Sequence, residues 1–159
     1  MLVKVKKLHK NAVLPEKAFP TDAGYDMYST SMSVDEDGNV VYGFGIAFEI
    51  PEGYAGFIFP RSSLSKFDLS LTNSVGVIDS HYRGEVTAKF KPLAIQPCRG
   101  RKMYEGYTDV YLANSAEIYK VGDKCAQIVF IKLPDIELNW SEELSETDRG
   151  TGGYGHTGI

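Results

Sequence analysis

Glycine and proline interrupt this sequence so often that a helical protein is excluded. Sixteen Gly and seven Pro are spread through 159 residues. They leave no uninterrupted helical period of the roughly 12 residues that a stable helix requires. Many short strand-like segments with turn signals between them are typical of a sandwich, a jelly roll or a distorted barrel. We therefore expect an all-β fold of the jelly-roll or barrel-like kind.

Several segments have the composition of strands, because they are rich in β-branched and aromatic residues or alternate apolar with polar residues. The expected strands are Leu2–Leu8, Val40–Ile50, Tyr54–Phe59, Glu85–Phe90, Thr108–Ala113 and Lys124–Leu133. The turn Pro51-Glu52-Gly53 is expected to join two of these strands. Ser62–Asp68 is expected to hold one short helical turn at most.

The composition is that of a single globular domain. Hydrophobic residues make up 43% and charged residues 24% of the chain, which argues against a disordered protein. The net charge of −4 and the pI near 5.4 argue against a general basic surface for nucleic acid, so we expect no direct binding to nucleic acid.

The expected location is the cytoplasm. No apolar stretch approaches the roughly 20 residues of a membrane span, and the N-terminal segment MLVKVKKLHK lacks the apolar region of a signal peptide. The two cysteines, Cys98 and Cys125, do not form a disulfide framework. A reducing compartment without membrane attachment is the simplest interpretation.

Two segments differ from the rest. Residues 97–120 are polar and rich in tyrosine, with a basic run at Arg99, Arg101 and Lys102. Apolar residues become sparse after Trp140, and residues 149–159 contain five glycines. We expect a domain over residues 1–140 with an inserted segment at about 97–120, followed by a flexible C-terminal segment over 141–159. Taken alone, such a terminus is more often a frayed tail than a functional element.

The residues exclude several kinds of chemistry. The three histidines do not have the spacing of a zinc site, and the nucleophile elbow G-x-S-x-G is absent. Asp26 and Asp79 remain as candidate acid–base or metal groups, although a single Asp after a strand is usually a turn former. Arg61 with the hydroxyls of Ser62 and Ser63 suits phosphate oxygens, although an ordinary polar loop has the same composition. A carboxylate-and-metal enzyme and a binding protein both stay open at this point.

Five motifs, taken in order, are more specific than any single residue. They are AGYDMYS at 23–29, PRSSL at 60–64, NSVGVIDSHYRGE at 73–85, GDKCAQIVF at 122–130 and DRGTGGYGHTG at 148–158. This series resembles the trimeric dUTPase family. The resemblance implies a jelly-roll-like subunit that forms a homotrimer and hydrolyses dUTP to dUMP and pyrophosphate with Mg²⁺. In that family one chain supplies the first, second and fourth motifs to a site, another chain the third motif, and the remaining chain the C-terminal arm.

The resemblance also implies roles for the nucleoside-binding residues. Asp79 corresponds to the aspartate that orients the attacking water, and an ionised carboxylate can accept its proton. Tyr82 corresponds to the aromatic residue beneath the deoxyribose, which leaves no room for a 2′-hydroxyl. The segment Asn73–Ile78, read as a tight hairpin, corresponds to the element that binds uracil. Its implied contacts come from Asn73, Gly76, Val77 and Ile78, and Gly76 permits a close backbone approach.

The phosphate-binding roles follow from the same resemblance. Arg61, Ser62, Ser63 and Gln127 correspond to residues that hold the phosphates, and Asp26 corresponds to a carboxylate that reaches Mg²⁺ through water. In the arm, Arg149 corresponds to a ligand of the γ-phosphate and Tyr154 to the ring that stacks on uracil. Gly155, His156 and Thr157 fall where the family binds phosphate.

Two alternatives remain. A dCTP deaminase shares the fold, but its chemistry needs a glutamate at the position that Lys89 occupies here. A regulatory protein with this fold would bind a protein partner through residues 97–120, whose Tyr and Arg residues favour interfaces. Phage members of the family carry such insertions, so the protein would act in the host cytoplasm if a phage encodes it.

If the resemblance to dUTPases holds, the enzyme would limit uracil incorporation into DNA and supply dUMP for dTMP synthesis.

Overall fold

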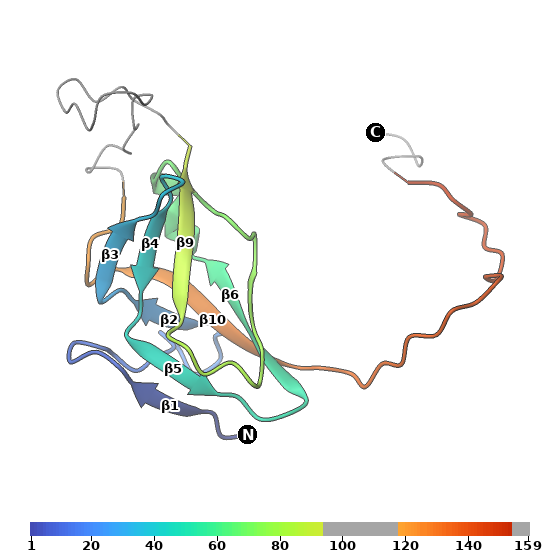
Figure 1. Ribbon diagram of the computed structural model, residues 1–159, viewed down its shortest axis with the longest axis horizontal. Coiled ribbons are helices and arrows are strands. Elements are labelled where there is room, and N and C mark those ends of the chain that lie inside the picture. The colour runs from blue at the N-terminus through green and yellow to red at the C-terminus, as the bar shows by residue number, and fades with distance from the viewer. Residues whose placement is uncertain (94–117, 154–159) are drawn as a thin grey trace.

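The structure is a computed structural model that describes residues 1–93 and 118–153 (Figure 1). This part of the chain contains ten strands and one short 3₁₀ helix, so the expected all-β class is confirmed. The elements are β1 (Lys4–Lys7), β2 (Tyr25–Tyr28), β3 (Ser31–Val34), β4 (Val40–Gly43), β5 (Ile46–Glu49), β6 (Tyr54–Pro60), η1 (Ser62–Lys66), β7 (Leu69–Leu71), β8 (Gly76–Ile78), β9 (Thr87–Pro92) and β10 (Lys124–Lys132).

The strands form three antiparallel sheets around one core. The two larger sheets have the strand orders β2-β10-β6-β8 and β3-β4-β9-β7, and β1 pairs with β5 in the third. Apolar side chains from all of these sheets fill the interior, and the largest fully buried ones include Tyr42, Phe44, Phe90, Met27, Ile58 and Ile128. Because β10 lies between β2 and β6, residues that are far apart in the sequence become neighbours on one sheet.

The expected strand over Val40–Ile50 is wrong as a single element. The chain leaves the sheet after Gly43 and begins β5 at Ile46, so the segment contributes to two different sheets. Gly45 makes this break, because it has a φ of 64° and a Cβ there would lie 2.6 Å from the Cβ of His9. The turn after Ile50 consequently connects β5 to β6 across sheets and does not close a hairpin.

The expected hairpin over Asn73–Ile78 is also wrong. Ser74 has a φ of 58° and forms a turn, after which β8 pairs with β6, whereas the preceding strand β7 pairs with β9. Strands β1, β6, β9 and β10 and the short helix η1 lie where the sequence predicted them. The expected strand Thr108–Ala113 lies outside the described residues. Strand β3 was not predicted, although its sequence Ser-Met-Ser-Val alternates polar and apolar residues; all four residues are exposed.

The chain from residue 133 to residue 153 contains no strand or helix and leads away from the sheets (Figure 1). Its apolar side chains lie in solvent: Leu138 is 90% exposed and Leu144 88%, and Trp140 is fully exposed. Within residues 1–93 and 118–153, no helix has the length and apolar character of a membrane span.

Candidate active site

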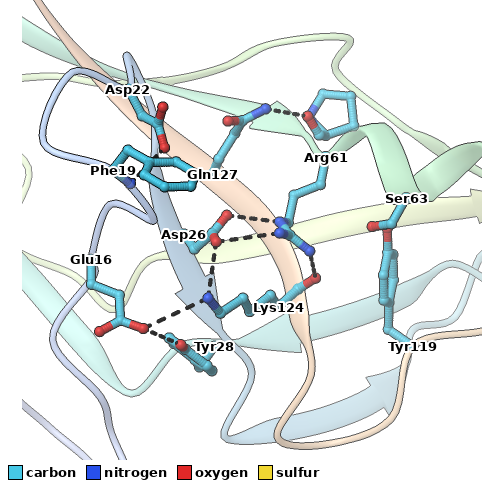
Figure 2. Close-up of polar contacts among 11 residues, drawn as sticks. Glu16, Phe19, Asp22, Asp26, Tyr28, Arg61, Ser63, Tyr119, Lys124 and Gln127 are labelled. Atoms are coloured by element: carbon cyan, nitrogen blue, oxygen red, sulfur yellow. Dashed lines mark hydrogen bonds and ion pairs between the residues drawn. The ribbon is translucent and has the colours of Figure 1, made fainter.

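Strand β10 brings residues of three predicted motifs together. Gln127 on β10 pairs with Asp26 on β2 and with Phe59 on β6. Its side-chain amide donates a hydrogen bond of 3.0 Å to the carbonyl of Pro60, the residue before Arg61 (Figure 2). The predicted phosphate-binding residues Arg61 and Gln127 and the predicted metal-linked Asp26 therefore meet at one end of β6.

Asp26 and Arg61 form an ion pair at this end of the sheet. Nε of Arg61 lies 2.7 Å from Oδ1 of Asp26, and Nη2 lies 3.3 Å from Oδ2. The Asp26 side chain is only 13% exposed and that of Arg61 29%. Nζ of Lys124 lies 3.1 Å from Oδ2 of Asp26, so one carboxylate holds two cations (Figure 2).

A β-bulge places Lys124 in this cluster. Lys124 pairs with Tyr28 and Ala126 pairs with Met27, so Cys125 is an extra residue in β10. Cys125 is fully buried, and burial raises the pKa of its thiol to about 12. The bulge thereby turns Lys124 to the face of Asp26. Its neighbours Tyr28 and then Asp26 raise the pKa of Lys124, which stays protonated.

Helix η1 carries the predicted phosphate-binding serines. Ser62 is exposed, and Ser63 is partly buried, with its hydroxyl 3.0 Å from the hydroxyl of Tyr119. Arg61 precedes the helix with its guanidinium fixed on Asp26, and its Nη1 donates to the carbonyl of Lys124 at 3.3 Å. Cationic and hydroxyl groups thus gather where an anionic ligand can accept hydrogen bonds.

The predicted nucleoside-binding residues line two adjoining hollows at β8 and β9. One, of about 240 Å³, is lined by Asp79 and Tyr82. The other, of about 380 Å³, is lined by Asn73 and Gly76, and Val77 and Ile78 contribute to both hollows. The Tyr82 hydroxyl donates to the carbonyl of Glu85 at 2.9 Å, so its ring folds over its own loop.

Asp79 and Arg61 lie at opposite ends of β6. Ile78 pairs with Gly56, so the following Asp79 comes level with the start of β6, whereas Arg61 follows its last residue. A strand rises about 3.3 Å per residue, which separates Asp79 from Arg61 by roughly 20 Å. The described part of one chain therefore does not bring the predicted general base to the predicted phosphate-binding residues.

The structure also leaves the C-terminal residues apart from both groups. Arg149 is exposed, and its Nε donates to the carbonyl of Gly152 at 2.9 Å in a local turn. The predicted residues Tyr154, Gly155, His156 and Thr157 lie outside the described residues.

Sequence reasoning missed Lys124 and Tyr119 as members of the site. The signal for Lys124 was present, because the apolar pair Cys125-Ala126 interrupts the alternation expected of a strand with one solvated face. The signal for Tyr119 was absent, because its partner Ser63 lies far away in the sequence.

Comparison with known proteins identifies the family. The family model for dUTPase matches residues 10–99 and 99–158. The chain belongs to the dUTPase family. A relative from Syntrophotalea carbinolica, named deoxyuridine 5′-triphosphate nucleotidohydrolase, is 34% identical over 99% of this chain and 97% of its own length. One of the same name from Nautilia profundicola is 36% identical over 99% of both chains.

Solved structures of phage dUTPases have the same fold as this family member. The Staphylococcus bacteriophage 80alpha dUTPase with dUPNHPP matches with a TM-score of 0.78 and 30% identity over 99% of both chains. The dUTPase from phage phi11 of S. aureus, described for its species-specific insert, matches with a TM-score of 0.70 and 30% identity over 92% of this chain and 100% of that chain.

Proposed function

We propose that this protein hydrolyses dUTP to dUMP and pyrophosphate. The observation that carries the proposal is the gathering of the predicted phosphate-binding groups at the end of β6, next to β8, which pairs with β6 and carries predicted nucleoside-binding residues. Relatives at 34% and 36% identity are named for hydrolysis of this nucleotide, and the 80alpha dUTPase was solved with dUPNHPP.

The proposed enzyme is a homotrimer in which copies complete one another's sites. One chain separates Asp79 from Arg61 by roughly 20 Å along β6, which is too far for both to act on one triphosphate. A cyclic arrangement solves this problem, because Asp79 of one copy can approach Arg61 of the next. The exposed Leu138 and Trp140, just before the proposed C-terminal arm of residues 141–159, and Leu144 within it support packing of this part of the chain on another copy. The arm follows the domain proposed for residues 1–140.

In the proposed reaction, Asp79 accepts a proton from the water that attacks the α-phosphorus. The new P–O bond forms as the bond to the bridging oxygen breaks, and pyrophosphate leaves. Arg61, Ser62, Ser63 and Gln127 bind the phosphates, while Asn73, Gly76, Val77 and Ile78 hold uracil and Tyr82 packs against the sugar. Arg149 binds the γ-phosphate, and Tyr154, Gly155, His156 and Thr157 complete the closed site.

Mg²⁺ is the proposed cofactor, and the donor set is compatible with it. Among residues 1–93 and 118–153, no three His, Cys, Asp or Glu side chains form a metal cluster. Mg²⁺ retains water readily and is commonly held by substrate phosphates with one or two carboxylates. Although Asp26 binds Arg61 and Lys124, its oxygens keep lone pairs that can accept hydrogen bonds from metal-bound water. The ion supplies neutralising charge to the triphosphate when it is bound.

Mixing two inactive variants tests the shared site. Asp79→Asn removes the proton acceptor, and Arg61→Ala removes a phosphate ligand, so each homotrimer should lose hydrolysis. Loss of a positioned base costs about 10²–10⁴-fold in turnover. Random trimers made by refolding the two variants together should recover about a quarter of the wild-type rate, because one intact site then forms in each mixed trimer.

The double variant carrying both changes, mixed with wild type, is the matched control for assembly. Pyrophosphate release from dUTP is the measurement throughout. A rate of pyrophosphate release from the refolded mixture that is no greater than the sum of the rates of the two separate variants would contradict shared sites. Wild-type protein that releases no pyrophosphate from dUTP would contradict the proposed function itself.

The structure bears on the deaminase alternative. Lys89 stands where a deaminase needs its glutamate, and its Nζ lies 2.7 Å from Oδ2 of Asp35. A lysine committed to this ion pair cannot move protons at a cytosine ring. Deamination is therefore the weaker candidate.

A regulatory function remains a second proposal. A structure of the 80alpha phage dUTPase is described in terms of both enzymatic activity and SaPI-inducing capacity, with a TM-score of 0.76 and 30% identity. We propose a protein partner for residues 97–120, most of which lie outside the described residues.

For the proposed hydrolase, the cellular role is the supply of dUMP and the exclusion of uracil from DNA. It would act in the cytoplasm, or in the host cytoplasm if a phage encodes the protein.

A further inference from the structure

Tyr119 contacts helix η1 at two points. Its hydroxyl lies 3.0 Å from the hydroxyl of Ser63 (Figure 2), and its ring packs on Phe67 with a centroid separation of 4.2 Å. Ser63 lies within the helix and Phe67 caps its C-terminal end. One side chain from the segment before β10 therefore holds both the middle and the end of the helix.

Tyr119 is itself held firmly in the core. It is 3% exposed, and its carbonyl accepts a hydrogen bond of 2.8 Å from the hydroxyl of Tyr42. The rings of Tyr42 and Phe90 each lie 6.2 Å from its own. Helix η1, by contrast, contains no buried residue and has no side-chain hydrogen bond at its N-terminal cap. Tyr119, the Arg61–Asp26 ion pair before the helix and the partly buried Leu64, which packs against the core, hold the helix in position.

The direction of the hydrogen bond between Ser63 and Tyr119 matters for phosphate binding. Burial raises the pKa of Tyr119, so its hydroxyl keeps its proton at neutral pH. A phosphate oxygen can only accept, so a Ser63 hydroxyl that binds phosphate must give its single proton to that oxygen. The Ser63 oxygen then remains free to accept from Tyr119, and hydrogen bonds in such a chain strengthen one another.

We propose that Tyr119 is a positioning residue for triphosphate binding, which donates to Ser63 and so directs the Ser63 hydroxyl toward a phosphate oxygen of the substrate. The inference rests on the proposed function, because it assumes that η1 binds the phosphates of dUTP. It assigns a role to Tyr119 that none of the five sequence motifs contains.

Steady-state kinetics of Tyr119→Phe, Ser63→Ala and the double variant test the proposal. Tyr119→Phe keeps the ring packing and removes one hydroxyl, so KM for dUTP should rise about three- to tenfold, as loss of a neutral hydrogen bond predicts. The kcat should change by less than about twofold, since ground-state and transition-state binding are weakened alike. The double variant should match Ser63→Ala, because Tyr119 acts only through Ser63.

Tyr42→Phe is the matched control. It also removes a buried hydroxyl from this cluster but leaves the Ser63–Tyr119 pair in place. Both tyrosine variants should lower the thermal midpoint, and only Tyr119→Phe should raise KM. An unchanged KM in Tyr119→Phe or Ser63→Ala, or additive effects in the double variant, would overturn the inference about Tyr119. Hydrolysis of dUTP by the wild type would still uphold the proposed function in that case. No hydrolysis of dUTP by the wild type would overturn both.

Discussion

The guanidinium of Arg61 binds both carboxylate oxygens of Asp26, with Nε to Oδ1 at 2.7 Å and Nη2 to Oδ2 at 3.3 Å. This two-point contact fixes the plane of the guanidinium before any substrate arrives. Lys124 shares Oδ2 of the same carboxylate at 3.1 Å. Asp26 thereby holds two cations at one end of β6, where a triphosphate would otherwise have to order them.

Substitutions on the two sides of this ion pair should separate metal binding from phosphate binding. Asp26→Asn should raise the Mg²⁺ concentration needed for half-maximal turnover, because a neutral amide accepts more weakly from metal-bound water. Arg61→Lys keeps the charge and loses the planar fork, so KM for dUTP should rise about tenfold with the Mg²⁺ requirement unchanged. Titrations of Mg²⁺ at saturating dUTP measure the difference. Equal Mg²⁺ requirements in wild type and Asp26→Asn would refute the metal-linked role of Asp26.

Selectivity for deoxyribose should depend on the ring of Tyr82. The ring lies over its own loop, with its hydroxyl donating to the carbonyl of Glu85 at 2.9 Å. Tyr82→Ala removes the surface that a 2′-hydroxyl would strike, so the ratio of kcat/KM for dUTP to that for UTP should fall by about tenfold or more. Tyr82→Phe retains the ring and should retain most of the selectivity. A ratio that is unchanged in Tyr82→Ala would place recognition of the sugar elsewhere.

Acid stability should depend on Asp35 at the β3–β4 connection. The ion pair with Lys89, at 2.7 Å, and the hydrogen bonds from Asn39 lower the pKa of Asp35 from 3.8 to about 2. A lowered pKa in the folded state stabilises the protein above the unfolded pKa, and this stability is lost as the pH falls through the folded value. Lys89→Met should therefore have a lower free energy of unfolding than wild type at neutral pH. This difference in stability, the gap, should disappear as the pH falls from about pH 4 to about pH 2.

Chemical denaturation across this pH range measures the gap. Lys4→Met is the comparison, because Lys4 and Glu49 form an ion pair whose side chains are 69% and 51% exposed. The pKa of Glu49 is lowered by Lys4, but exposed pairs contribute little to stability, so the gap in that variant should be smaller. A Lys89→Met gap that stays constant from neutral pH to about pH 2 would contradict the role of Asp35.

The sequence was sufficient for the fold class, because glycine and proline spacing is a local signal. The grouping of Asp26, Arg61 and Gln127 followed only from the resemblance of the motif series to the family. The break at Gly45 followed from a positive φ and the close approach of His9, which depends on tertiary structure. The register shift at Cys125 moved Lys124 to the site, and register depends on the partner strand.

The separation of Asp79 from Arg61 within one chain was implied only by the family resemblance, in which the third motif comes from another chain, and no local signal in the sequence predicts it. It arises because β8 pairs with β6 in antiparallel register, so that the chain runs back along β6 from Asn73 toward Asp79. The sequence pattern instead predicted a hairpin with both of its strands within Asn73–Ile78. Non-local strand pairing therefore places Asp79 and Arg61 at opposite ends of β6 in one copy.

Deletion of residues 148–159 should remove activity and leave the assembly. The last strand ends at Lys132, and the exposed Leu138, Trp140 and Leu144 all precede the deletion, so the surfaces proposed to join the copies remain. The deletion removes Arg149, the proposed ligand of the γ-phosphate. Loss of a cation that neutralises the charge on the leaving pyrophosphate should cost about a hundredfold or more in turnover.

Light scattering and pyrophosphate release measure the two parts of this last prediction, and Arg149→Ala is the matched point variant. Trp140 is the single tryptophan of the chain and is fully exposed in one copy, so its emission reports whether the segment directly before the arm packs on a neighbour. We expect emission at shorter wavelength in the assembled protein than in unfolded protein, in both the full-length and truncated chains.

Ordering the arm costs about 1–2 kcal/mol per residue, which contacts with nucleotide must offset. Hydrogen exchange over residues 141–153 should therefore slow when a non-hydrolysable dUTP analogue binds. Normal turnover by the truncated protein, or equal exchange with and without the analogue, would show that the C-terminal segment does not close the site.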